Sequence, residues 1–247
     1  MIEKVKKGEI IARRAMKLIL LGLFFSVTPL MAEPPTSRFD PEIQKTLENG
    51  LVLHLKLEKG LTDSSSKNHG TKIIGDVKIE EGEGAIFDGD GDCIELAAFD
   101  MADKSFAVLM WIKVTGEFGP HGVFQQKSAG KKREWLHFVL RNPMNPYLGF
   151  YMQDMWSDSM IRKIDGWRHV VVQYRRDKGI AEIWLDGVLD ATKRRESFLG
   201  KSGTFQIGKA PSWGNVPMSD FQGILRDFRI YDRSLTEFEI GALALMR

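Results

Sequence analysis

The chain has 247 residues, 43% of them hydrophobic and 28% charged, which is enough for one large β domain or two small ones. The formal net charge is +2, but residues 1–32 hold six Lys or Arg and only two Glu. Of the 35 basic and 33 acidic residues, 29 and 31 remain outside this segment, for a net charge of −2. A nucleic-acid partner is therefore not expected, because it would require a basic face.

The N-terminus has the pattern of an exported protein. The stretch "MKLILLGLFFSVTPLMAEPP" begins at Met16, and its apolar run 18–25 ends well before Ala32 and Glu33. This predicts a signal peptide over residues 1–32, cleaved near Ala32, with Met16 as an alternative start. The apolar run is shorter than the roughly 20 residues that span a bilayer, so no membrane span is expected after cleavage. The alternative is a buried N-terminal helix. We expect a periplasmic or extracellular protein.

Residues 33–49 are polar and Pro-rich and are predicted to form a linker, followed by one domain over residues 50–247. Cys93 is the single cysteine, so it cannot form a disulfide within the chain, and we expect it to be buried as a small apolar residue.

Short runs with β-strand character alternate with turn residues along the domain. They are "LVLHLKL", "AIFDGDGDCIEL", "SFAVLMWIKV", "WLHFVL", "YLGFYM", "WRHVVVQY", "IAEIWL", "GTFQIG" and "GILRDFRIY". Asp186-Gly187 suits a type I′ hairpin turn. One helix is expected, with Ser234 as its cap and Glu237 completing a capping box. This pattern predicts an all-β fold, a two-sheet antiparallel jelly-roll sandwich with a short C-terminal helix.

Five segments, in order, resemble laminin G-like domains of the concanavalin A-like lectin/glucanase superfamily. They are "LVLHLKLEKGLTDSSSKNHGT" (51–71), "AIFDGDGDCIEL" (85–96), "FAVLMWIKV" (106–114), "WRHVVVQYRRDKGIAEIWLDGV" (167–188) and "FQGILRDFRIYDRSLTEFEI" (221–240). The resemblance implies the same jelly roll. In the fourth segment Trp167, Val170, Val172, Ile183 and Leu185 are expected to pack in the core.

No catalytic residues are expected. Related hydrolases of the laminarinase type carry E-x-D-x-x-E on one strand, and retaining chemistry needs carboxylates about 5–5.5 Å apart. This chain lacks that triplet, and Asp186, four residues after Glu182, belongs to the hairpin turn. The five histidines have no metal-like spacing. A glycoside hydrolase that uses carboxylates from distant loops is the third hypothesis.

The resemblance also implies a Ca²⁺ site at the rim of the jelly roll. Asp63, in "TDSSSKNHG", and Asp227, in "ILRDFRIY", match the family's calcium-binding acids. Arg226 stands where the family has another Asp, and a guanidinium there could pair with a carboxylate in place of the ion. The structural alternative is that Asp63 orders its own loop through an Asx turn.

An aromatic sugar site is the second candidate. Carbohydrate sites pair an exposed ring with hydrogen-bonding groups, and two turn-rich segments offer both (142–160 and 209–220). The alternative is that the aromatic residues plug the ends of the sandwich. Trp213 is the ring most expected to be exposed. The candidate ligand-binding residues are Tyr147, Asp154, Trp156, Asp158, Trp213 and Asn215.

Two basic clusters, "YRRDKG" (174–179) and "TKRRES" (192–197), suit either an acidic glycan or solvated turns. The sequence thus favours an exported, non-catalytic, lectin-like module that binds carbohydrate, with or without Ca²⁺. The alternative is a structural or adhesion domain that binds a cell-surface protein.

Overall fold

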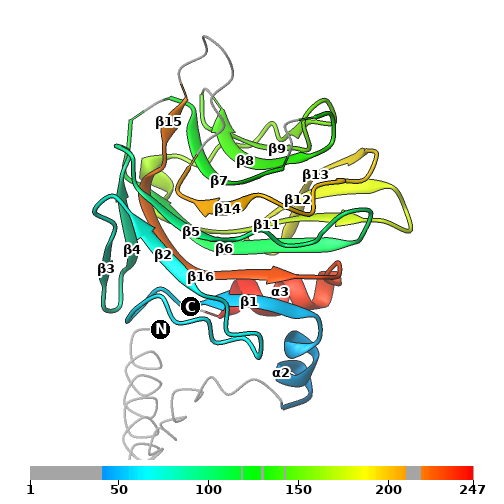
Figure 1. Ribbon diagram of the computed structural model, residues 1–247, viewed down its shortest axis with the longest axis horizontal. Coiled ribbons are helices and arrows are strands. Elements are labelled where there is room, and N and C mark those ends of the chain that lie inside the picture. The colour runs from blue at the N-terminus through cyan, green and yellow to red at the C-terminus, as the bar shows by residue number, and fades with distance from the viewer. Residues whose placement is uncertain (1–40, 118, 129–130, 142, 210–217, 247) are drawn as a thin grey trace, which may run out of the picture. The chain divides into compact units, whose positions relative to one another are not determined.

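A computed structural model describes residues 41–117, 119–128, 131–141, 143–209 and 218–246, which fold as two stacked β-sheets (Figure 1). Sheet A has the strand order β13-β12-β11-β6-β16-β4-β3, with β1 paired to β16. Its strands are β1 (Leu51–Leu55), β3 (Lys78–Glu80), β4 (Gly84–Asp88), β6 (Phe106–Val114), β11 (Trp167–Arg175), β12 (Ile180–Leu185), β13 (Val188–Arg194) and β16 (Gln222–Tyr231).

Sheet B has the order β10-β9-β8-β7-β14-β5-β2, with the two-residue β15 paired to β7. All described pairings are antiparallel except that of β15, so the predicted jelly-roll sandwich is confirmed. The strands are β2 (Thr71–Ile74), β5 (Cys93–Ala97), β7 (His121–Lys127), β8 (Trp135–Arg141), β9 (Asn145–Gly149), β10 (Met155–Trp156), β14 (Thr204–Ile207) and β15 (Ser219–Asp220).

The core lies between the sheets, where alternate residues of each strand meet. Phe124 of β7 stacks on Phe138 at 5.7 Å and on Phe205 at 5.5 Å between ring centroids. Val170, Val172, Ile183 and Leu185 are buried in this core as expected. Trp167 is not, because strand alternation from Val170 places it with His169 on the outer face, where it is half-buried. Cys93 is free and buried, as expected.

Two helices cover part of the outer face of sheet A (Figure 1). Helix α3 (Glu237–Leu245) buries Ile240 and Leu243 against Leu109, Val171 and Trp184, and helix α2 (Pro41–Glu48) adds Leu47. The expected linker thus contains a helix, because this sheet face is apolar and needs a cover. A short 3₁₀ helix, η1 (Lys163–Asp165), precedes β11.

The turn chemistry follows the sequence with one correction. Asp186 (φ 51°) and Gly187 (φ 84°) both adopt positive φ, as a type I′ turn requires. The C-terminal helix is capped by Thr236 and Glu239, two residues later than Ser234 and Glu237. Thr236 Oγ1 accepts from the Glu239 amide, and the Glu239 carboxylate accepts from the Thr236 amide. Arg233 also pairs with Glu239, which fixes the later start.

Candidate functional site

The outer face of sheet B carries a row of rings on neighbouring strands. In β8, Leu136, Phe138 and Leu140 point into the core, so Trp135 and His137 point outward. His137 stacks on Tyr147 of β9 (5.8 Å, 21°), and Tyr147 stacks on Trp156 of β10 (6.4 Å, 5°). Tyr147 is 5% exposed and Trp156 is 56% exposed. The row therefore ends in an open indole supported from below by a buried ring.

A cavity of about 290 Å³ opens beside this indole. Asn145 lines this cavity and fixes the segment that follows β10, because its side-chain amide donates to the carbonyls of Ser157 (3.1 Å) and Ser159 (2.9 Å). The hydroxyls of both serines donate to Asp190 of β13, which ties the segment after β10 to sheet A. The residues that line the cavity are Arg141, Asn145, Trp156, Ser157 and Asp158.

Cations lie over the last two rings of this row, Tyr147 and Trp156. Lys193 is 4.9 Å from the centroid of the Trp156 ring, and the Arg141 guanidinium is 4.9 Å from that of Tyr147. Lys193 belongs to the basic segment 192–197, so part of that segment lies at the aromatic site. Arg195, from the same segment, donates to the backbone carbonyl of Asp154.

Polar groups form a buried layer beneath the rings. Asp154 Oδ1 lies 3.9 Å from His137 Nε2, and both atoms lie against Gly149. A Cβ at this position would come within 2.4 Å of each atom, so only glycine leaves room for them. Burial raises the pKa of the Asp154 carboxyl, against the opposing effects of Tyr147 and Arg195. Burial lowers the pKa of His137 to about 3, so its imidazole is neutral near pH 7. The pKa of the Tyr147 hydroxyl is raised by burial and by Asp154.

Four of the six residues predicted for a sugar site lie together here: Tyr147, Asp154, Trp156 and Asp158. Trp213 and Asn215 lie outside the described residues. Tyr147 is a buried support and not an exposed platform, because it lies in register beside Trp156, with its ring between those of His137 and Trp156. The sequence did not indicate that Arg141, Asn145 and Lys193 belong to this site, although Asn145 lies in the segment 142–160 and Lys193 in the basic cluster 192–197. The alternation in "WLHFVLR" was a signal for Arg141, whereas Lys193 is brought in by β13 from far along the chain.

Asp63 has the surroundings of a structural residue. Its Oδ1 accepts from the amides of His54 (3.0 Å) and Ser65 (2.8 Å). Its Oδ2 accepts from the His69 amide (2.8 Å) and the Ser65 hydroxyl (2.9 Å), and His69 Nδ1 is 3.0 Å away. These hydrogen bonds hold the pKa of the Asp63 carboxyl far below its usual range, against the effect of burial.

Asp227 is also paired. Arg229 donates to both of its oxygens (2.8 and 3.0 Å), and His54 Nε2 is 2.7 Å from Oδ1. The hydrogen-bond donors around Asp63 and Asp227 occupy the carboxylate oxygens of both residues. Because Ca²⁺ needs six to eight oxygen ligands, the two residues as placed do not fit a Ca²⁺ site. The guanidinium that pairs with Asp227 is Arg229 and not Arg226.

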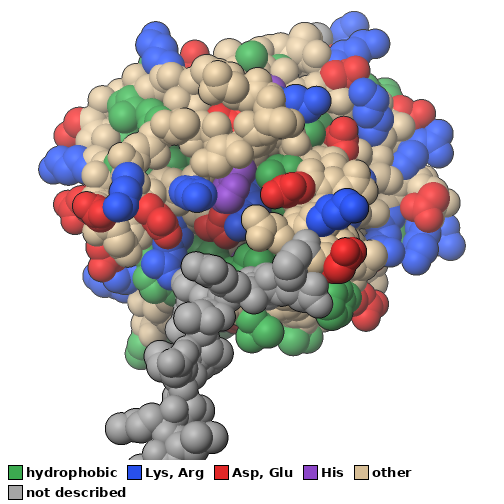
Figure 2. Space-filling view, turned by 90° about the horizontal axis from the view of Figure 1, so that it is seen from below, with side chains coloured by type: hydrophobic (Ala, Val, Ile, Leu, Met, Phe, Trp, Pro, Cys, Tyr) green, Lys and Arg blue, Asp and Glu red, His purple; other side chains and the backbone are tan. Residues whose placement is uncertain are grey.

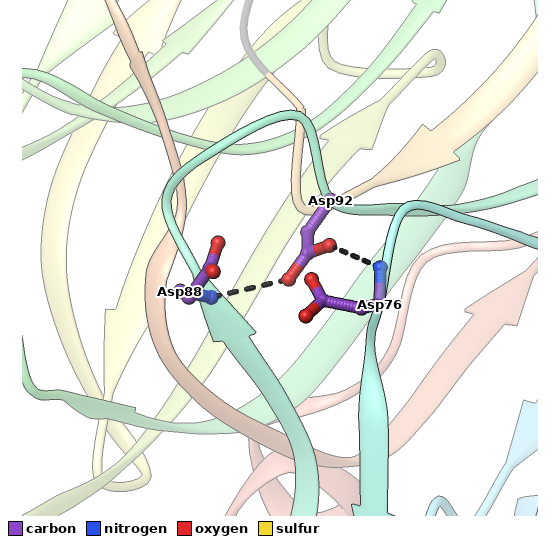
Figure 3. Close-up of side chains that lie close together, drawn as sticks. All are labelled: Asp76, Asp88 and Asp92. Carbon is purple, nitrogen blue, oxygen red and sulfur yellow. Dashed lines mark hydrogen bonds between the residues drawn. The ribbon is translucent and has the colours of Figure 1, made fainter.

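Three other carboxylates come together where β4 leads into β5 (Figure 3). Asp76, Asp88 and Asp92 each offer an oxygen within 4.8 Å of the others. Asp92 is buried, and its two oxygens accept from the amides of Asp76 (2.8 Å) and Asp88 (3.2 Å). The oxygens suit a hard cation, but these hydrogen bonds give the cluster a structural role of its own.

Comparison with known proteins identifies the family. Residues 88–241, more than half of the chain, match the concanavalin A-like lectin/glucanases superfamily, and the chain belongs to that family. None of the curated proteins matches the sequence.

Solved structures of similar fold include binding domains of botulinum neurotoxins. The botulinum neurotoxin DC binding domain, in complex with rat synaptotagmin II, is 17% identical with a TM-score of 0.61, covering 80% of this chain and 51% of that one. Botulinum neurotoxin type C, whose cell entry depends on interaction with two ganglioside molecules, is 19% identical with a TM-score of 0.59, covering 81% and 52%. This chain thus spans about half of each neighbour. At these identities the likeness shows the fold. Among the described residues, no helix is long and apolar enough to cross a membrane.

Proposed function

We propose that this protein is an exported, non-catalytic carbohydrate-binding module whose ligand stacks on Trp156. The observation that carries the proposal is an indole 56% exposed, parallel to Tyr147 and open to a polar cavity. An apolar ring face suits the C–H face of a sugar, while Asn145, Asp158 and Arg141 offer acceptors and donors for its hydroxyls.

Preorganisation supports this assignment. Trp156 lies on a strand paired to β9, and Asn145 and Asp190 hold the segment that follows it. Little conformational entropy is therefore lost when a ligand binds. The family includes lectins, and one structural neighbour requires gangliosides for cell entry, which agrees with a glycan ligand.

Trp156→Ala tests the proposal on a glycan array followed by calorimetry with the best ligand. Loss of the stacking surface should weaken binding by about 1–3 kcal/mol, as for other aromatic stacking surfaces. The free energy of unfolding should change little, because the indole is largely exposed. Phe238→Ala is the matched control, since Phe238 is 66% exposed on α3, on the outer side of the other sheet. Equal glycan affinity in both variants would overturn the proposal.

Trp213 and Asn215 stay a prediction for the same site. Trp213→Ala, measured in the same series, should lose ligand affinity without loss of stability if its ring is a second platform. A stability loss of about 3–5 kcal/mol would instead identify a buried plug.

Binding of a cell-surface protein is the second candidate function. A neighbour of the same fold is seen in complex with synaptotagmin, and Ile164 of η1 is 84% exposed, as an apolar anchor for a protein would be. A protein ligand captured equally by wild type and Trp156→Ala, with no glycan bound by either, would favour this function.

Export is tested separately. The signal pattern of residues 1–32 predicts that protein recovered from a secreting host begins near Glu33. An intact Met1 or Met16 terminus on protein retained in the cytosol would contradict export.

A further inference from the structure

A second cavity, of about 250 Å³, lies on the outer face of sheet A. Figure 2 shows this side of the molecule, where a histidine lies among acidic and basic side chains. The cavity is separated from Trp156 by the thickness of the sandwich, since the two sites lie on outer faces of opposite sheets. Its lining residues are His54, Lys56, Glu58, Trp111, Arg226, Asp227, Arg229 and Met246.

A β-bulge builds the floor of this cavity. The register of β16 against β6 shifts between Arg226 and Arg229, and Asp227 within the shift has a φ of 50°. Bulges re-aim side chains and are enriched next to functional sites. Here Asp227 is held by Arg229 and His54, and its amide donates to the Lys56 carbonyl. The negative charge of Asp227 is therefore already compensated by Arg229.

Arg226 is a cation of this cavity that Asp227 does not neutralise. Its guanidinium carbon is 4.4 Å from the centroid of the Trp167 ring and 6.0 Å from that of Trp111. Within the described residues, its side chain has no hydrogen bond or ion pair, and neither has that of Lys56. A guanidinium stacked on an indole is fixed in orientation while its in-plane N–H groups stay available, the geometry that binds two oxygens of one acid.

The same row of the sheet holds a buried polar group with no partner. Arg226 pairs in register with Trp111, and Trp111 with His169 of β11. His169 is fully buried, its ring 5.2 Å from that of Trp111, and neither ring nitrogen has a hydrogen-bond partner among the described residues. Such a group in a folded protein calls for an explanation, and an adjacent ligand or ordered water supplies one.

We propose that this cavity is an oxyanion-binding site for the carboxylate, phosphate or sulfate group of a small ligand. Arg226 supplies the bidentate contact, Lys56 a second positive charge, and Trp111 and Trp167 the walls. The charge balance favours an anion: Lys56, Arg226 and Arg229 face only Glu58 and Asp227 among the carboxylates of the lining. The site does not depend on the carbohydrate function proposed for Trp156.

Calorimetric titration of the full chain with glucuronate, inorganic phosphate and glucose, at constant ionic strength, tests the site. One or both acids should bind in a way that depends on Arg226, and any binding of glucose should be independent of Arg226. Binding of glucuronate alone indicates an acidic sugar, and binding of phosphate alone indicates a phosphorylated ligand. Arg226→Gln should weaken acid binding about tenfold to a hundredfold, the loss expected for a charge-assisted hydrogen-bonded pair.

Three further variants separate the geometry of Arg226 from its charge, from net charge and from the glycan site. Arg226→Lys keeps the charge without the planar fork and should bind with intermediate affinity. Arg194→Gln removes an exposed arginine that has no ion pair among the described residues, and it should bind as wild type does. Trp156→Ala should leave phosphate binding unchanged, because phosphate offers no sugar face to stack on the indole, so failure of the glycan proposal is distinguishable. Absence of acid binding, or equal affinity in Arg226→Gln and Arg194→Gln, would overturn the proposal.

Discussion

The two outer faces of the sandwich are formed by the same alternation of inward and outward residues, but one is covered by helices and the other is not. On sheet A the outward residues near α3 are apolar, namely Ala107, Leu109, Val171 and Trp184, and helices cover them. On sheet B the outward residues are rings and polar groups, and no described helix packs on them. The difference shows that the cover, and not the strand pattern, decides which outward face is core and which can bind a ligand.

Two tryptophans make the comparison concrete. Trp184 of β12 is 4% exposed, and its indole N–H donates to Glu182 (3.0 Å) beneath α3. Trp156 of β10 is 56% exposed and has a lysine over its ring. Both are outward-facing residues at strand spacing. An outward tryptophan is therefore a binding candidate only where nothing packs on it.

The largest expected effect is a loss of stability when the covered face of sheet A is mutated. Trp184→Ala should lose about 3–5 kcal/mol of unfolding free energy, because it leaves a cavity under α3 and removes a donor to Glu182. Urea denaturation of this variant beside Trp156→Ala is the direct measurement. A similar small loss in both variants would show that α3 contributes little to stability and that the comparison of faces is wrong.

Asp63 gives an intermediate effect. Asp63→Asn should destabilise by about 1–3 kcal/mol, because an amide cannot accept all the hydrogen bonds that the carboxylate accepts. The folded-state pKa is depressed, so this contribution is present above the unfolded pKa of about 3.9 and is lost as the pH falls below it. Asp177→Asn, at an exposed turn position, is the control.

The same variants address calcium, which stays a prediction. Since hydrogen bonds occupy the Asp63 oxygens, Asp63→Asn should cost the same with Ca²⁺ as with chelator. A stabilisation by Ca²⁺ that disappears only in Asp63→Asn would restore the expected ion site. A stabilisation that survives there and disappears in Asp92→Asn would place the ion at Asp76, Asp88 and Asp92.

The fold was predictable from local signals, and the site only in part. Alternation and the Asp186-Gly187 turn report on neighbouring residues, and they sufficed for the sandwich. Thr236 replaced Ser234 as the cap where Arg233 pairs with Glu239, and Arg233 is itself held by tertiary hydrogen bonds to the carbonyls of Thr46 and Asn49. The aromatic segment of residues 142–160 was rightly singled out, but Lys193 reaches Trp156 through strand pairing that no local pattern encodes. Likewise, the donors around Asp63 come from three positions that only the folded loop brings together.

The smallest effect concerns Lys193, whose ammonium lies over the ring that we propose as the sugar platform. Lys193→Gln should leave the unfolding free energy nearly unchanged, because the side chain is exposed. Its effect on binding depends on the ligand. A neutral sugar must displace the ammonium from the indole, so its affinity should stay equal or rise slightly in the variant. An acidic sugar should lose affinity a few-fold, and the loss should shrink as salt is added, since exposed charges are screened. Lys178→Gln, at another exposed position, controls for net charge. If neutral and acidic ligands weaken equally at every salt concentration, Lys193 instead donates to a hydroxyl that both share, and the ammonium does not compete for the ring.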